Sequence, residues 1–218
     1  MATQTTLKLT NGSGTDVKVY LTLGATPGCV QDVKAIGFVT DPVNPLQGWF
    51  MLRNRASVTY APPQGEGING NFAFGSPPLN CPTTEYLNGI NLAEFILNNS
   101  FQGPGAQETI DISCVAGANA LIAFTMTGGG PWNAGSTQPN VSQFANKALG
   151  QNTGLVGAFP CGCDNCTSRA NPPQPSCPAS PPPPAYEDCQ AEPICNVQRD
   201  ASSPGGTVEV IFQGFLPN

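Results

Sequence analysis

Hydrophobic and polar residues alternate over short stretches along much of this chain. The first stretch spans residues 5–23, where alternating runs at 6–10 and 17–21 flank a Gly-rich turn at 11–14. Strict alternation over four to eight residues is typical of a strand with one buried face. Two such runs joined by a Gly-rich turn are typical of a β-hairpin. We therefore predict a hairpin over residues 5–23.

Further strands are predicted at intervals along the chain. Ile68, Phe72 and Phe74 fall on one face at a period of two, with Gly70 as a gap in that face. The remaining predicted strands are rich in β-branched, aromatic or aliphatic residues and are separated by turn residues; they lie at 50–52, 56–60, 92–98, 108–113, 120–126 and 207–212. Many short strands with turns between them predict a β-sandwich or barrel.

A single helix is predicted, over residues 142–149, with Ser142 as its N-cap and Gly150 at its C-terminal end. The composition otherwise favours strands and turns. Charged residues make up only 10% of the chain, and 25 Gly and 23 Pro disfavour helix interiors. At 218 residues and 39% hydrophobic content, the chain is long and apolar enough for a sizeable core. The predicted fold class is therefore all-β.

Charge and residue types exclude several functions. The net charge is −6, and the eight basic residues are scattered without forming a stripe, so we predict no nucleic-acid partner. The same acidity and the lack of a long apolar run predict no membrane partner. The chain has no histidine, which excludes a Ser-His-Asp triad, a Cys-His pair and an HExxH zinc site.

The nine cysteines are unevenly distributed, since six of them lie between Cys161 and Cys195. Together with a Pro-rich run at 181–184, this indicates a loop-rich lobe over 127–196 that is held by disulfides. The rest of the chain, 1–126 and 197–218, is the predicted sandwich core, and the two parts form one compact unit.

The cysteines expected in disulfides are Cys81, Cys161, Cys163, Cys166, Cys177, Cys189 and Cys195. The C-x-C-x2-C spacing that begins this cluster also suits a metal site, but disulfides are favoured because no histidine accompanies it. We predict neither a metal nor a cofactor.

Cysteine content also bears on localisation, because thiol-rich chains are typical of oxidising compartments. No secretory signal lies ahead of the first strand, since Met1 is followed directly by polar residues. We predict an extracellular protein whose signal peptide has been removed; an intracellular protein is the alternative. The odd number of cysteines leaves one thiol free or available for self-association.

Several segments resemble, in order along the chain, those of the thaumatin-like proteins, also called pathogenesis-related family 5. Leu92-Ala93-Glu94-Phe95 followed by Thr109-Ile110-Asp111-Ile112-Ser113 is similar to the core motif of that family. Four further matches are at 8–11, at 56–65, at 70–73 leading to Cys81, and at 205–212. The resemblance implies a thaumatin-like β-sandwich with a loop-rich, disulfide-stapled lobe.

The chain departs from this family in its cysteines. The bridge that ties the first strand of the family to the last falls on Ser13 and Gln213, so both partners are missing together. Cys114 is the first candidate for the free thiol because the family has no cysteine there, and Cys29 is the second.

Family members that bind or cut β-1,3-glucan carry an acidic cleft of one Arg, one Glu and three Asp. By position, Glu94 corresponds to the Glu and Asp111 to the first Asp. The third Asp falls on Glu187 or Asp188. The resemblance thus implies a ligand site at Glu94, Asp111 and Asp188.

Two members of this pattern are replaced, the Arg by Gly75 and the second Asp by Ala116. Aromatic residues that could stack on sugar rings are Trp49, Tyr60, Tyr86, Tyr186 and, in an irregular Gly-rich segment, Trp132. Trp132 is the best surface candidate because of that segment.

The resemblance implies a secreted protein that binds cell-wall or other polysaccharide of the β-glucan kind, with a role in defence. Two carboxylates also suffice for glycoside hydrolysis, so Glu94 and Asp111 are candidate catalytic residues for a weak endo-β-1,3-glucanase. A structural or self-assembling extracellular protein without catalysis is the other alternative, because charge is low and the surface is rich in Gly, Asn and Pro. Binding is favoured over catalysis.

Overall fold

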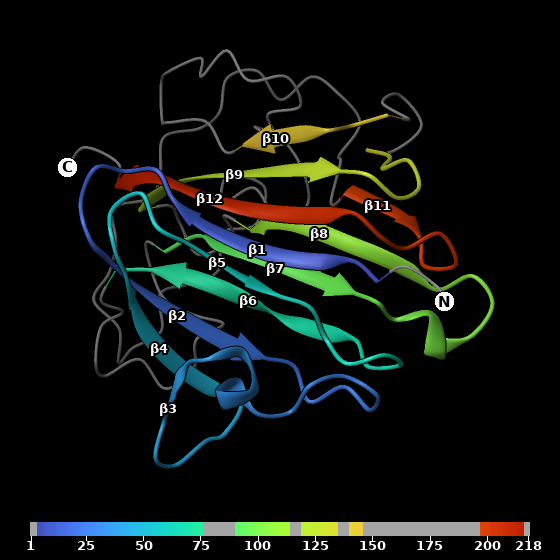
Figure 1. Cartoon of the computed structure of the whole chain (residues 1–218), viewed down its shortest axis with the longest axis horizontal. Coiled ribbons are helices and arrows are strands. Elements are labelled where there is room, and N and C mark those ends of the chain that lie inside the picture. The colour runs from blue at the N-terminus through green and yellow to red at the C-terminus, as the bar shows by residue number, and fades with distance from the viewer. Residues whose placement is uncertain (1–3, 76–89, 114–118, 135–139, 146–196, 216–218) are drawn as a thin grey trace, which may run out of the picture.

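The computed structural model describes residues 4–75, 90–113, 119–134, 140–145 and 197–215. Within these ranges the regular structure is almost entirely β-strand, arranged in two sheets, which confirms the predicted all-β class (Figure 1). The described residues also include two short 3₁₀ helices, η1 (Val33–Ile36) and η3 (Ser100–Gln102).

One sheet has five strands among the described residues, in the order β10-β9-β12-β1-β5. Its pairs are antiparallel except for β1 and β12, which run parallel. Its strands are β1 (Thr6–Asn11), β5 (Ser57–Tyr60), β9 (Ala120–Thr127), β10 (Gln143–Ala145) and β12 (Thr207–Phe215).

The other sheet has seven strands in the described ranges, in the order β11-β8-β7-β6-β2-β4-β3, and its pairs are all antiparallel. Its strands are β2 (Val17–Leu23), β3 (Val39–Thr40), β4 (Gln47–Leu52), β6 (Ile68–Phe74), β7 (Leu92–Leu97), β8 (Gln107–Ser113) and β11 (Val197–Asp200).

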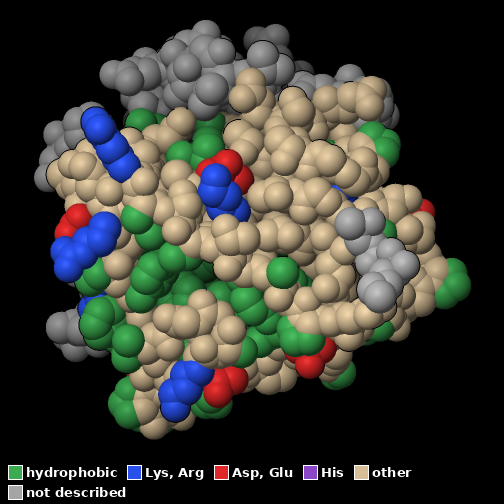
Figure 2. Space-filling model, in the orientation of Figure 1, with side chains coloured by type: hydrophobic (Ala, Val, Ile, Leu, Met, Phe, Trp, Pro, Cys, Tyr) green, Lys and Arg blue, Asp and Glu red, His purple; other side chains and the backbone are tan. Residues whose placement is uncertain are grey.

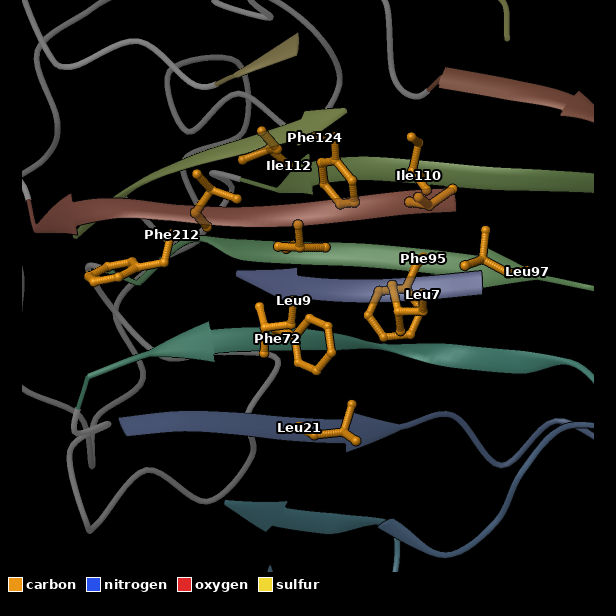
Figure 3. Close-up of a cluster of buried hydrophobic side chains, with 14 of the residues drawn as sticks. Leu7, Leu9, Leu21, Phe72, Phe95, Leu97, Ile110, Ile112, Phe124 and Phe212 are labelled. Carbon is orange, nitrogen blue, oxygen red and sulfur yellow. The ribbon is translucent and has the colours of Figure 1, made fainter. Parts of the chain in front are cut away.

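The core lies between the two sheets, and the alternation in the sequence decides which residues enter it. Leu7 and Leu9 of β1 are buried while their neighbours on the strand are half-buried. Figure 3 shows these leucines in one cluster with Phe72 and Phe95 of the seven-stranded sheet. The Phe72 and Phe95 rings are 5.0 Å apart at their centroids. Burial of such rings supplies much of the hydrophobic stabilisation of a sandwich.

The predicted hairpin over residues 5–23 is wrong in its pairing, although both of its strands form. β1 and β2 belong to different sheets, because both edges of β1 are taken by β12 and β5. The side-chain amide of Asn11, which is fully buried, fixes the crossing between the sheets. It donates to the carbonyl oxygens of Thr15 at 2.7 Å and Leu52 at 3.0 Å.

The predicted helix over 142–149 is also wrong where the structure describes it. Residues 143–145 form β10, which pairs antiparallel with β9. The Phe144 ring stacks on the Phe124 ring with centroids 5.0 Å apart, and both are buried. This packing outweighs the weak helical tendency of the segment. Residues 146–149 lie outside the described ranges.

The first and last strands are joined without the bridge that ties them together in the thaumatin-like family. β1 and β12 form a parallel ladder of six residue pairs, from Thr6 opposite Thr207 to Asn11 opposite Phe212. The backbone N–H of Gly12 extends it by donating to the carbonyl oxygen of Phe212 at 2.8 Å. Ser13, which stands where the family has one cysteine of that bridge, comes directly after this ladder.

Part of the predicted lobe contributes to the sandwich, since Val141 and Phe144 belong to the main buried cluster. Most of the lobe, 146–196, lies outside the described residues. The same is true of all seven cysteines predicted to form disulfides and of Cys114. The division into core and lobe therefore stays a prediction.

The hydrophobic core is more exposed to solvent along the side of the sandwich where β5 and β4 lie near the sheet edges. Val58 of β5 is 41% exposed although it is paired with the buried Leu9. Phe50 of β4 and Tyr60 of β5 are only half-buried while they pack against the core. Figure 2 shows hydrophobic side chains gathered in this part of the surface, with charged side chains scattered around them.

Gly70 explains the gap in the inward face of β6. A Cβ atom added there would lie 2.5 Å from the carbonyl oxygen of Thr22 on β2, and real contacts of this kind are essentially never so short. We expect Gly70→Ala to lower the free energy of unfolding by about 1–3 kcal/mol, because a strand must shift to relieve the clash. Urea denaturation measures the change.

Gly12→Ala is the matched control for this substitution. A Cβ at Gly12 would meet its nearest atoms at 3.5 and 3.6 Å, which is ordinary contact. We expect a change within about 0.5 kcal/mol there. Equal effects at the two glycines would contradict the clash as the cause.

Candidate functional site

Glu94 and Asp111 lie side by side on the outer face of the seven-stranded sheet. They are direct partners in the antiparallel pairing of β7 and β8. Their neighbours Phe95 and Ile110 are buried in the core, so alternation turns both carboxylates outward. The Cβ atoms of residues directly opposite each other are about 4.5–5.5 Å apart. The structure therefore brings together the two acids that the resemblance had singled out.

The two acids end a row of polar side chains that crosses five adjacent strands. Asn71 of β6 is the partner of Glu94, Thr22 of β2 is the partner of Asn71, and Gln47 of β4 is the partner of Thr22. All five residues are half-buried. We call Gln47, Thr22, Asn71, Glu94 and Asp111 the polar row. With strands about 4.8 Å apart, it is roughly 19 Å long.

An aromatic pair lies next to one end of the polar row on the same outer face. Trp49 of β4 is the partner of Tyr20 of β2. This pair lies two residues along the strands from the pair of Gln47 and Thr22. Trp49 is 37% exposed, and Tyr20 is half-buried. The ammonium group of Lys18 lies 4.4 Å from the centroid of the Trp49 ring and 4.9 Å from that of Tyr20. Such cation–π contacts hold both rings in place.

The residues that follow Trp49 and Tyr20 across the sheet, towards the strand that carries Glu94, are apolar and buried. Ala73 and Leu92 are 4% and 8% exposed and form a small cluster with Ile90, against which Tyr20 packs. Trp49 is therefore much more exposed to solvent than Ala73 and Leu92. The outer face thus offers a polar track beside Glu94 and an aromatic surface near Gln47.

The position of the family's Arg, Gly75, has a local structural reason for being glycine. Its φ is +95°, a left-handed conformation that side chains rarely adopt. A Cβ there would also lie 3.1 Å from the ring of Phe215. This position therefore supplies no cation beside Glu94 and Asp111. Ala116, Glu187 and Asp188 lie outside the described residues, so the prediction for Asp188 stays a prediction.

The prediction that Trp132 is a surface residue is wrong. Trp132 is only 3% exposed and belongs to the main core cluster. Its ring is covered by the Arg199 guanidinium, whose carbon lies 4.6 Å from the ring centroid. The irregular, Gly-rich sequence around it does not expose it, because Asn133 bridges to Gln198 of β11 and draws the segment onto the sheet. Trp49 is the exposed tryptophan instead.

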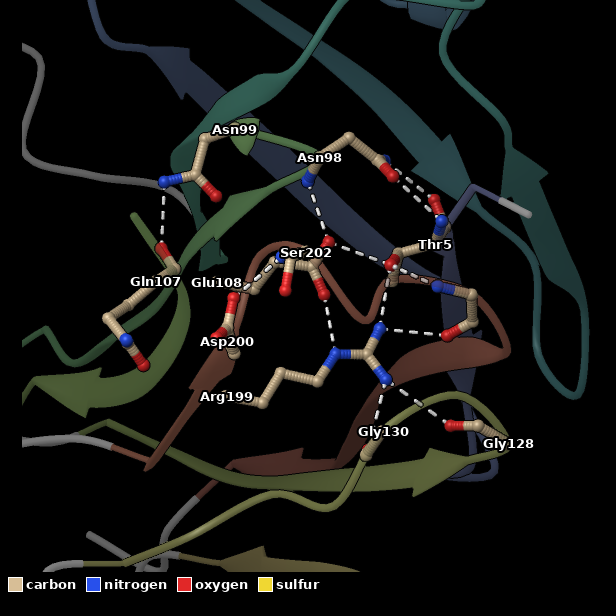
Figure 4. Close-up of polar contacts among 11 residues, drawn as sticks. Thr5, Asn98, Asn99, Gln107, Glu108, Gly128, Gly130, Arg199, Asp200 and Ser202 are labelled. Atoms are coloured by element: carbon tan, nitrogen blue, oxygen red, sulfur yellow. Dashed lines mark hydrogen bonds and ion pairs between the residues drawn. The ribbon is translucent and has the colours of Figure 1, made fainter. Parts of the chain in front are cut away.

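A buried polar centre, which the sequence analysis missed, lies elsewhere in the fold (Figure 4). The Nε of Arg199 donates to Glu108 at 2.6 Å, and the two side chains are 1% and 0% exposed. The Thr5 hydroxyl donates to Glu108 and accepts from Arg199, each at 2.7 Å. The backbone N–H of Asn98 also donates to Glu108, at 2.7 Å. Because the Arg199 and Glu108 side chains are out of contact with solvent, we assign this centre a structural role.

A sequence signal for this buried centre did exist. Glu108 falls in phase with Ile110 and Ile112 on β8, so alternation alone places it on the inward face. A buried carboxylate requires a cationic or hydrogen-bonding partner. This signal identifies Glu108 only, because its partner Arg199 lies on β11, whose four residues have no apolar majority.

Cys29, the second candidate for a free thiol, is free and buried in the structure. Burial raises the pKa of its thiol, which therefore stays protonated and poorly nucleophilic. Its burial also keeps it from bonding to another chain without local opening. In the described part of the chain, no group of three or more acidic or cysteine side chains could hold a metal ion. No helix among those residues is long and apolar enough to span a membrane.

No protein-family model matches the chain. No curated protein matches it. Among solved structures, a thaumatin-like xylanase inhibitor matches with 12% sequence identity and a TM-score of 0.40, and the match covers 94% of this chain and 97% of the inhibitor.

Proposed function

We propose that this chain is a secreted, divergent thaumatin-like protein that binds a neutral polysaccharide of the β-glucan kind through the polar row. The observation that carries the proposal is the register of Glu94, which lies opposite Asp111 on one side and Asn71 on the other. Carboxylates and amides are suitable partners for sugar hydroxyls, because hydrogen bonds to charged groups are stronger than neutral ones.

Charge favours a neutral glycan over an acidic one. The chain carries a net charge of −6, and two carboxylates lie together at one end of the polar row. An anionic sugar would be repelled there, since like charges brought together raise the energy of both. Secretion is part of the proposal because cysteines are abundant in the chain.

Binding is favoured over hydrolysis by the loss of the cation in the family's cleft. A glycosidase needs one of its two carboxyl groups to stay ionised as base or nucleophile. Glu94 and Asp111 lie directly opposite each other on adjacent strands, and the cation that would help to keep one of them ionised is replaced by Gly75. We expect no catalysis from this pair.

Retention on insoluble polysaccharide tests the proposal. We expect the protein to be retained on at least one of β-1,3-glucan, cellulose and chitin. The double variant Glu94→Gln, Asp111→Asn should bind at least about tenfold more weakly, because each lost charged hydrogen bond is worth about 1.5–3 kcal/mol. Depletion assays over a range of polysaccharide concentrations give the affinities.

The control is Glu66→Gln, which removes an exposed carboxylate from the loop between β5 and β6 and should leave retention unchanged. Reducing-end release should stay at background for all variants. The proposal fails if the wild-type protein is retained on none of the three polysaccharides, or if the double variant is retained as well as the wild type. Reducing-end release that disappears in Glu94→Gln would favour the glucanase alternative.

A further inference from the structure

We propose that Trp49, held beside Tyr20, forms an aromatic end to the same binding face, so that the ligand is an extended glucan chain lying across the strands from β4 to β7. The inference rests on the proposed function and specifies the direction and minimum length of the ligand. It comes from the strand register, which brings residues from four separate segments onto one surface.

The geometry gives a continuous path from the aromatic pair to the acids. Trp49 and Gln47 both point outward from β4, with Gly48 between them buried on the opposite face. Gln47 is joined through Thr22 and Asn71 to Glu94 by successive register pairs. No change of face and no break in pairing interrupts this path.

The path offers both kinds of contact that a sugar ring can make. A pyranose ring has apolar C–H faces and a rim of hydroxyl groups. Trp49, which is 37% exposed, offers an apolar aromatic ring, while the polar row offers amide, hydroxyl and carboxylate groups. Trp and Tyr are suited to such mixed surfaces because they combine a large apolar area with low conformational entropy.

Lys18 makes this aromatic surface rigid before a ligand arrives. Its ammonium group lies within 5 Å of both ring centroids, at 4.4 Å from Trp49 and 4.9 Å from Tyr20. A ring that is already held in one orientation loses less entropy on binding. Lys18 therefore acts as a positioning residue and need not touch the glycan.

The separation of the two ends sets the length of the ligand. Trp49 and Glu94 are three strand spacings and one two-residue step apart, which is about 16 Å. A single sugar ring is much shorter than this distance, so the ligand must be an oligosaccharide of several rings. A disaccharide can occupy one end but not both.

Tryptophan fluorescence provides a direct readout, because the chain has two tryptophans and Trp132 is buried under Arg199. We expect the emission to move to shorter wavelength when laminarihexaose or cellopentaose saturates the protein. Trp49→Phe should abolish this shift, leaving Trp132 as an unresponsive reference. The matching disaccharides, laminaribiose and cellobiose, test the length requirement.

Calorimetry with the same oligosaccharides gives the energetic test. Trp49→Ala should weaken binding of the longer oligosaccharides about tenfold, as expected for loss of one aromatic contact. The preference of the wild-type protein for the longer over the matching shorter oligosaccharide should shrink by the same factor. Phe215→Ala is the matched control, since Phe215 is an aromatic residue 49% exposed on the other sheet, and it should bind like wild type.

The outcomes separate this inference from the proposed function. Retention on insoluble glucan with unchanged tryptophan emission at saturation would overturn the aromatic end and leave the polar row as the site. Equal affinities of Trp49→Ala and wild type for the longer oligosaccharides would do the same. If no oligosaccharide or polysaccharide binds at all, both proposals fail.

Discussion

Replacing Arg199 with methionine is expected to lower the free energy of unfolding by about 3–5 kcal/mol, because it leaves a carboxylate buried without its counter-ion. Glu108 is fully buried and its ion pair with Arg199 has an N–O distance of 2.6 Å. The substitution would also remove the donors to the carbonyl oxygens of Gly128, Gly130 and Gly205. Equilibrium urea denaturation at neutral pH measures the loss.

An exposed ion pair offers a matched control for this prediction. Arg53 and Asp16 are also 2.6 Å apart, but their side chains are 77% and 39% exposed. Arg53→Met should therefore cost no more than about 1 kcal/mol. A loss at Arg199 no larger than the loss at Arg53 would contradict the view that burial of the pair makes it important.

A double variant separates the ion pair from the packing around it. Arg199→Met together with Glu108→Met removes both charges and keeps apolar volume at the site. It should be more stable than Arg199→Met alone, because no isolated charge remains. The Thr5 hydroxyl would still accept from the backbone N–H of Gly205 at 3.0 Å.

The strands could be predicted from the sequence because alternation is a local signal. Ile68, Phe72 and Phe74 point inward as their spacing predicts. Strand pairing is a different matter, since it depends on which distant strands compete for each edge. The turn after β1 suggested a hairpin, yet the ladder with β12 and the buried side chain of Asn11 direct β2 into the other sheet. β11 was missed because its four residues alternate between buried and exposed without an apolar majority.

The candidate site was predictable only in part for the same reason. The resemblance singled out Glu94 and Asp111, and the register of β7 and β8 places them together. Asn71 and Thr22 joined them only once the pairing of β6 with its neighbours was known. The choice of Trp132 as the best surface candidate was wrong, since Trp49 is the more exposed of the two tryptophans. Trp132 lies in an irregular segment but is covered by Arg199, which comes from a distant part of the sequence.

The aromatic core beneath the polar row gives the second large expected effect. Phe72 is 2% exposed, and its ring centroid lies 5.0 Å from that of Phe95 and 6.1 Å from that of Phe38. Phe72→Ala would leave a cavity between two packed sheets that relax little, so we expect a loss of about 3–5 kcal/mol. Thermal and urea denaturation should agree on the size of the loss.

This substitution also tests whether the binding face depends on its core only through folding. Phe72 points inward while its neighbour Asn71 points outward, so the polar row keeps its side chains and its register partners. Glycan affinity per folded molecule should therefore stay within about twofold of wild type, even as stability falls. Phe101→Ala, at an aromatic residue that is 41% exposed, should cost about 1 kcal/mol or less. If Phe72→Ala weakened binding as strongly as loss of the two acids, the site would extend into the core, because no outward side chain had been removed.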